Sequence, residues 1–165
     1  MPTPETNSKN NLSQNNLYET DFYAWTQEQV ALLRHHQWHQ LDLENLIEEI
    51  ESLGKQQRQE LRNRLSLLIG HLLKWEYQPQ YRSRSWLSTI RVQRRDILRL
   101  LKDNPSLKSY QNEAILEAYE NGKDLAMGET NLPIETFPKY CLYSLAELLD
   151  NQFYPGEESE LIKLY

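Results

Sequence analysis

The chain has 165 residues and a formal net charge of −6, with 39% hydrophobic residues, which is the size and composition of one domain. Valine occurs only twice and glycine five times, which argues against a β-sheet protein. Cys141 is the only cysteine, which excludes an intramolecular disulfide or a cysteine-based zinc site and fits the cytoplasm. The longest apolar stretch is far shorter than the ~20 residues that span a bilayer, so we expect no membrane association.

The two ends of the chain differ in composition from the middle. Residues 1–16 are rich in Asn, Ser, Thr and Pro and lack the regions of a secretory signal, so we predict a disordered tail. Residues 17–155 are predicted to form a single helical domain. The acidic residues 156–165 are predicted to be a frayed tail.

The first two helices are predicted over residues 21–36 and 42–77. Thr20 or Asp21 can cap the first, and Thr26 with Gln29 matches a capping box. Asp42 is a suitable cap for the second. Its apolar residues keep helical spacing: Leu43, Leu46, Ile47, Ile50, Leu53, Leu61, Leu65, Leu68, Leu72 and Trp75. A straight helix of this length would overhang a compact globule, so either Gly54 bends or breaks it or the domain is elongated.

The remaining elements follow the loop of residues 76–85. A helix is predicted over 86–103, capped by Ser83 or Ser85, and another over 107–128, capped by Ser106. Ser144 and Glu147 match a second capping box. Residues 61–75 are apolar on most sides, which indicates a central helix, and Gly70 would permit close approach of another backbone. The predicted fold is an all-α bundle of about four main helices with short C-terminal turns.

A polar cluster is the main candidate site. If helices 61–77 and 86–103 form an antiparallel hairpin, His71 and Lys74 face Gln93 and Arg94. One interpretation is a buried network that fixes helix register. The other is a cationic pocket for a phosphate-bearing ligand or a general acid–base pair, with Arg82 and Trp86 nearby.

The basic stretch 74–102 carries a net charge of +6 within an acidic chain. Such asymmetry is found in nucleic-acid-binding surfaces. However, four of these cations lie opposite the apolar face of their helix: Arg91, Arg95, Arg99 and Lys102. This arrangement is typical of the solvent-exposed side of an amphipathic helix. We therefore rank nucleic-acid binding below the structural interpretation.

Histidines and aromatic residues supply the remaining candidates. His35 and His39 have the i, i+4 spacing that can bind a metal on a helix, but no HExxH motif accompanies them, and we predict no metal and no cofactor. Aromatic side chains in connecting segments are expected to mark a partner surface, in particular Trp38, Tyr77 and Tyr81.

Several sequence blocks carry a family resemblance. YETDFYAW (18–25), LDLENLIEEIESLG (41–54), HLLKWEYQP (71–79), RSWLSTIRVQR (84–94), NPSL (104–107) and ETNLPIETFP (129–138) occur in the order found in the bacterial "domain of unknown function 29" family. The chain resembles this family over roughly residues 17–155. The resemblance implies a helical fold and no settled activity, and it directs attention to His71, Lys74, Trp86, Gln93 and Arg94.

The functional prediction is a non-enzymatic interaction module that binds a protein partner or self-associates. No nucleophile motif, Gly-rich phosphate loop or paired-carboxylate signature is present to favour an enzyme. The alternative is an enzyme or binder acting on a phosphate-bearing ligand or nucleic acid through His71, Lys74, Arg82, Gln93 and Arg94.

Overall fold

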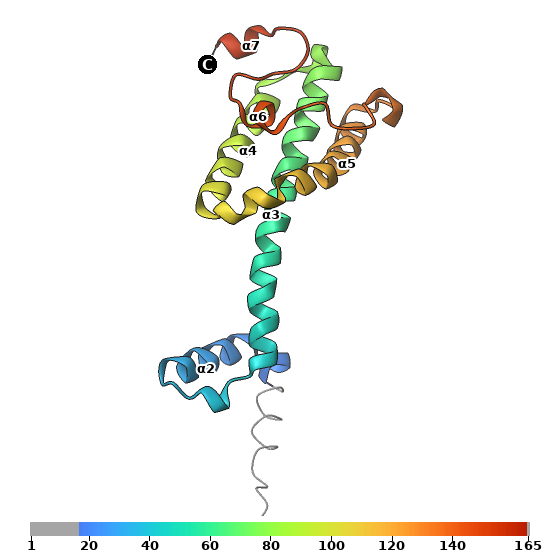
Figure 1. Cartoon of the computed structure of the whole chain (residues 1–165). Helices are drawn as coiled ribbons and strands as arrows, with labels where there is room; N and C mark the ends of the chain where they lie inside the picture. Colours follow the sequence, from blue (N-terminus) through green and yellow to red (C-terminus); the bar gives the residue numbers. More distant parts are fainter. Residues whose placement is uncertain (1–16, 165) are drawn as a thin grey trace, which may run out of the picture. The chain divides into compact units, whose positions relative to one another are not determined.

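The computed structural model describes residues 17–164, so the tail predicted for residues 1–16 lies outside the described residues. The described residues form helices and connecting turns without a β-strand, which confirms the all-α prediction. They divide into two compact units, one ending at Lys55 and the other beginning at Gln56. Figure 1 shows the elements of each unit.

The N-terminal unit contains α2 (Phe22–Arg34), the short 3-10 helix η1 (Trp38–Gln40) and the first turns of α3 (Leu43–Tyr77). Asp21 caps α2, its carboxylate accepting from the Ala24 amide at 3.0 Å. The capping box predicted at Thr26 is wrong, because this residue lies within α2 and its hydroxyl donates to the Tyr23 carbonyl.

Asp42 joins the start of α3 to α2. Its carboxylate accepts from the Trp25 indole at 3.1 Å and from the Asn45 amide at 2.7 Å. Its own backbone amide donates to the Gln29 side chain at 2.9 Å. The bonds to Trp25 and Gln29 are buried and occupy groups that would be costly to leave unpaired, so they fix the start of α3 against α2.

Helix α3 runs without interruption through Gly54. The sequence left open whether this glycine bends or breaks the helix. The helical assignment continues on both sides of Gly54, so this glycine does not break the helix.

The second unit contains the rest of α3 and the elements that follow it. These are η2 (Pro79–Tyr81), α4 (Arg84–Asp103), η3 (Pro105–Tyr110), α5 (Gln111–Thr130), η4 (Ile134–Thr136), α6 (Leu145–Leu149) and α7 (Glu160–Lys163). Helix α7 lies within the segment predicted to be a frayed tail.

Helix α4 returns antiparallel to the end of α3, as predicted. Lys74 near the end of α3 contacts Trp86 near the start of α4. Ten residues earlier on α3, Arg64 pairs with Asp96, ten residues later on α4, at 2.9 Å. The opposite directions of these two contacts establish the hairpin, and Figure 1 shows the two helices side by side.

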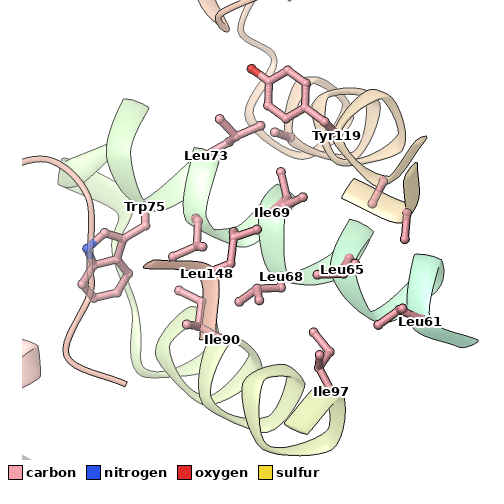
Figure 2. Packing of buried hydrophobic residues seen from close by; sticks show 14 of the residues in the cluster. Leu61, Leu65, Leu68, Ile69, Leu73, Trp75, Ile90, Ile97, Tyr119 and Leu148 are labelled. Atoms are coloured by element: carbon pink, nitrogen blue, oxygen red, sulfur yellow. The ribbon is translucent and has the colours of Figure 1, made fainter. Parts of the chain in front are cut away.

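One apolar cluster forms the core of the second unit (Figure 2). Leu61, Leu65, Leu68 and Ile69 of α3 are fully buried, which confirms the prediction of a central helix. Side chains from the surrounding elements pack around them, among them Ile90, Ile97, Tyr119 and Leu148. Fully burying one such aliphatic side chain contributes about 1.5–3 kcal/mol.

Helices α3 and α5 approach closely at Gly70 and Gly122. A Cβ atom added at Gly70 would lie 2.6 Å from Leu125 Cδ2 and 3.2 Å from the Gly122 carbonyl oxygen. A Cβ added at Gly122 would lie 3.1 Å from the Gly70 backbone nitrogen. The absence of side chains at these two positions therefore permits the crossing, as predicted for Gly70.

The caps of the later helices agree with prediction at two of three positions. Ser83 caps α4, and Ser144 with Glu147 forms the predicted capping box at α6. Ser106 does not cap α5, because it lies inside η3 and α5 begins only at Gln111. Proline at the first position of η3 starts this tighter turn.

Candidate functional site

Lys74 is buried between three helices, with its side chain only 3% exposed. Its ammonium group forms an ion pair with Glu129 of α5 and lies 4.4 Å from the ring centroid of Trp86 on α4. Two of the predicted site residues, Lys74 and Trp86, are thus brought together. The charge of Lys74 is compensated within the protein by a carboxylate and an aromatic face.

His71 lies one turn before Lys74 on α3. Its Nδ1 lies 2.9 Å from the Leu67 carbonyl of the same helix, so this nitrogen is the donor. Burial lowers the pKa of His71, the backbone bond raises it in part, and the nearby Lys74 charge lowers it further. The lowered pKa favours the neutral imidazole, which is hydrogen-bonded to its own helix.

Gln93 bonds to a different part of α3. Its carbonyl oxygen accepts a long 3.4 Å bond from Arg64, which also pairs with Asp96 and with Glu60. His71 and Gln93 therefore bond to separate partners, and no hydrogen bond joins them in the described part of the chain.

Arg94 is completely buried and binds backbone carbonyl groups. Its guanidinium donates to Leu148 and to Phe153, each at 2.7 Å, and lies 5.1 Å from the ring centroid of Tyr154. Burial lowers the pKa of Arg94. A guanidinium with two backbone carbonyl acceptors orders the segment that supplies them, here the turn after α6.

Arg82 holds the same C-terminal segment further along. It donates to the Trp75 carbonyl and to the Glu157 carbonyl, both at 2.7 Å, and stacks over the Trp75 ring at 4.8 Å. Arg82 and Arg94 each donate to at least one backbone carbonyl more than 50 residues away in the sequence, which no side-chain pattern reveals.

An exposed apolar face lies on the N-terminal unit. Leu43, Ile47, Ile50 and Leu53 on α3 are 57%, 56%, 65% and 60% exposed. The first three follow i, i+4, i+7 spacing and form one stripe along the helix. We call Leu43, Ile47, Ile50 and Leu53 the apolar face. Their helical spacing was predicted, but their exposure was not.

The basic side of α4 is solvent-exposed, as its helical spacing predicted. Arg95, Arg99 and Lys102 are exposed, whereas Arg91, predicted to share their exposure, is half-buried. A shallow depression near them is lined by Arg91, Arg95, Leu98, Asn151 and Gln152.

The histidines near the end of α2 do not share a helical face. The helix ends at Arg34, so the expected extension to His36 is wrong, and His36 takes a left-handed backbone conformation with φ of 57°. His35 and His39 are therefore not one helical turn apart. Between residues 17 and 164 no group of three or more His, Cys, Asp or Glu side chains is placed to hold a metal ion.

The exposed aromatic residues agree with prediction in part. Trp38 and Tyr81 are more than half exposed. Tyr77 instead packs edge-on against Phe137, with ring centroids 5.4 Å apart. The single cysteine, Cys141, is half-buried, and burial raises the pKa of its thiol.

Comparisons with known proteins identify one family. No helix over residues 17–164 is long and apolar enough to cross a membrane. Searches of curated proteins and of solved structures gave no match. The family model "Domain of unknown function DUF29" matches residues 17–154, which is most of the chain. The chain therefore belongs to the DUF29 family.

Proposed function

We propose that this chain is a non-enzymatic protein-interaction module and that the apolar face of α3 is its binding surface. The observation that carries the proposal is the exposure of Leu43, Ile47, Ile50 and Leu53, each more than half accessible to solvent on one helix. Contiguous exposed apolar side chains rimmed by polar residues are characteristic of protein-binding surfaces. The lone cysteine suits the reducing cytoplasm, where we place this activity.

The phosphate-binding alternative has less support. Lys74 is paired with Glu129, and Arg94 and Arg82 donate to backbone carbonyls. A phosphate site needs donors that point to an accessible ligand. Because these cations are engaged inside the protein, we rank the interaction module first.

The test compares capture of native proteins by three forms of the immobilised full chain. The forms are wild type, Ile47→Lys/Ile50→Lys, and the control Leu116→Lys, which changes an equally exposed apolar residue on α5. Lysine favours a helix, so the variants keep the fold, which circular dichroism verifies. We expect specific proteins to bind wild type and the control and to be lost with the double variant.

Two results would contradict the proposal. One is an identical set of captured proteins for all three forms. The other is captured material that disappears on nuclease treatment, which would transfer support to the nucleic-acid alternative.

A further inference from the structure

The apolar face is bordered by a row of glutamates. Leu43, Ile47 and Ile50 are each followed directly by a glutamate, namely Glu44, Glu48 and Glu51. Successive residues on a helix are turned by about 100°, so three residues at i, i+4, i+7 have their successors in a parallel row. The acidic row therefore runs along one edge of the apolar stripe for about two turns.

The opposite edge of the stripe is occupied within the same unit. There the Asp42 carboxylate accepts from Trp25, and the Glu49 carboxylate accepts from the Tyr18 hydroxyl at 2.6 Å. These two carboxylates are used internally. Beside Asp42 and Glu49 the stripe is thus bordered by carboxylates already bonded within the unit, whereas the carboxylates on the other edge have no such partner.

Glu44, Glu48 and Glu51 are exposed, and none forms an ion pair with another residue of the described range 17–164. The helix dipole stabilises acidic groups chiefly in the first turn, which accounts for Glu44 but not for Glu48 and Glu51. Three aligned carboxylates beside an apolar stripe repel one another, and a row of cations opposite them would relieve this repulsion.

The charge of the whole unit selects the kind of partner. Residues 17–55 contain eight acidic and two basic side chains. A second copy that docked through the same face would bring acidic residues against acidic residues. Residues 1–16 offer only Met1 and Leu12 as large apolar side chains, too few to match the stripe. A basic amphipathic helix supplies both complements, apolar residues for the stripe and cations for the row.

We propose that the apolar face of α3 binds an amphipathic helix of a partner protein whose apolar stripe is flanked by lysine or arginine. This proposal rests on the proposed function and names its partner class. Affinity comes from burial of the aliphatic side chains, while the Glu44, Glu48 and Glu51 row selects basic partners and sets the salt dependence.

The test uses two designed helical peptides of 18 residues as probes. Both carry leucine at i, i+4, i+7 and i+11; one has lysine at the positions that follow, and the other has glutamate there. Binding to the full chain is measured by fluorescence anisotropy at low and high salt. We expect the lysine peptide to bind at least about tenfold more tightly than the glutamate peptide at low salt, and this preference to shrink as salt rises.

Matched variants distinguish an effect of the acidic row from an effect of the overall negative charge of the chain. Glu44→Gln/Glu48→Gln/Glu51→Gln is expected to reduce the preference to about threefold or less. The control Glu157→Gln/Glu158→Gln/Glu160→Gln removes the same number of negative charges from exposed positions of the second unit. It is expected to leave the preference for the lysine peptide unchanged.

The outcomes distinguish this inference from the proposed function. If both peptides bind equally and Ile47→Lys/Ile50→Lys abolishes binding of both, the apolar face binds proteins but the basic partner class is wrong. Absence of binding by the lysine peptide overturns the inference. Sedimentation showing a wild-type dimer that Ile47→Lys/Ile50→Lys converts to a monomer overturns it too, in favour of a second copy.

Discussion

Lys74 and Glu129 are unequally buried, and this inequality decides what each contributes to stability. The Lys74 side chain is 3% exposed, whereas the Glu129 side chain is 49% exposed. Removing the carboxylate leaves a buried, unpaired ammonium group. Removing the ammonium leaves a carboxylate that water can solvate.

Glu129→Ala is therefore expected to lower the free energy of unfolding by about 2 kcal/mol, and Lys74→Met by less than about 1 kcal/mol. Chemical denaturation measures both. Glu120→Ala is the control, because Glu120 lies on the same helix and pairs with Lys123 at the surface. A larger loss for Lys74→Met than for Glu129→Ala would contradict the account of this pair.

Even the conservative substitution Arg94→Lys is expected to destabilise the protein. A single ammonium group cannot reach both the Leu148 and the Phe153 carbonyls that the guanidinium bonds. Arg94→Lys should cost about 2–3 kcal/mol and speed proteolysis after α6, whereas Arg95→Lys next to it, exposed on α4, should change neither. Equal protease resistance of the two variants would show that Arg94 does not hold this segment.

The lowered pKa of His71 predicts the sign of a pH dependence of stability. Burial lowers the folded-state pKa of His71, so the unfolded state binds more protons as pH falls below about 6.5. This contribution is complete above that pH and is lost as the pH decreases toward the folded-state pKa. Denaturation between pH 8 and 5 should show a smaller loss of stability on acidification for His71→Gln than for wild type; an unchanged slope would contradict it.

At the scale of elements, two glycines of α3 are expected to respond in opposite ways. A Cβ at Gly54 meets nothing within 4 Å, whereas a Cβ at Gly70 meets α5. Gly54→Ala should stabilise the protein by about 0.5–1 kcal/mol through helix propensity, and Gly70→Ala should destabilise it by about 1–3 kcal/mol. Thermal unfolding of the two variants gives the signs; destabilisation by both would mean that α3 needs Gly54 for another reason.

Local signals predicted helix positions well and failed where the backbone makes a tighter turn. Asp21, Ser83 and Ser144 cap helices as their side chains and neighbours indicate. Ser106 was equally suitable in type, but Pro105 starts a 3-10 helix and delays α5 to Gln111. Thr26 matched a capping box that an earlier cap at Asp21 had already made unnecessary.

Only those parts of the candidate cluster that lie within the α3–α4 hairpin could be predicted from the sequence. The antiparallel arrangement of α3 and α4 followed from the apolar spacing and the loop at 76–85. Which residues meet within it depends on register, which pairs Lys74 with Trp86 and places Gln93 near Arg64. Other partners come from distant segments, about which helical periodicity carries no information: Glu129 for Lys74, the Glu157 carbonyl for Arg82, and the Leu148 and Phe153 carbonyls for Arg94.

At the scale of the whole molecule, apolar periodicity identified the faces of α3 but not which of them are covered. Leu61 and Leu65 are fully buried, while Ile47 and Ile50, with the same helical spacing, are more than half exposed. The difference depends on which elements pack beside each part of the helix. A partner surface and a core surface therefore have the same sequence pattern until the fold is known.

The most direct measurement is a methyl NMR titration of the full chain with the lysine-bearing amphipathic peptide. The account predicts that the methyl signals of Leu43, Ile47 and Ile50 shift, while those of Leu116 and Leu142, which are equally exposed elsewhere, stay in place. Signals that shift at Leu116 and Leu142 instead, or a spectrum that does not change at all, would contradict it.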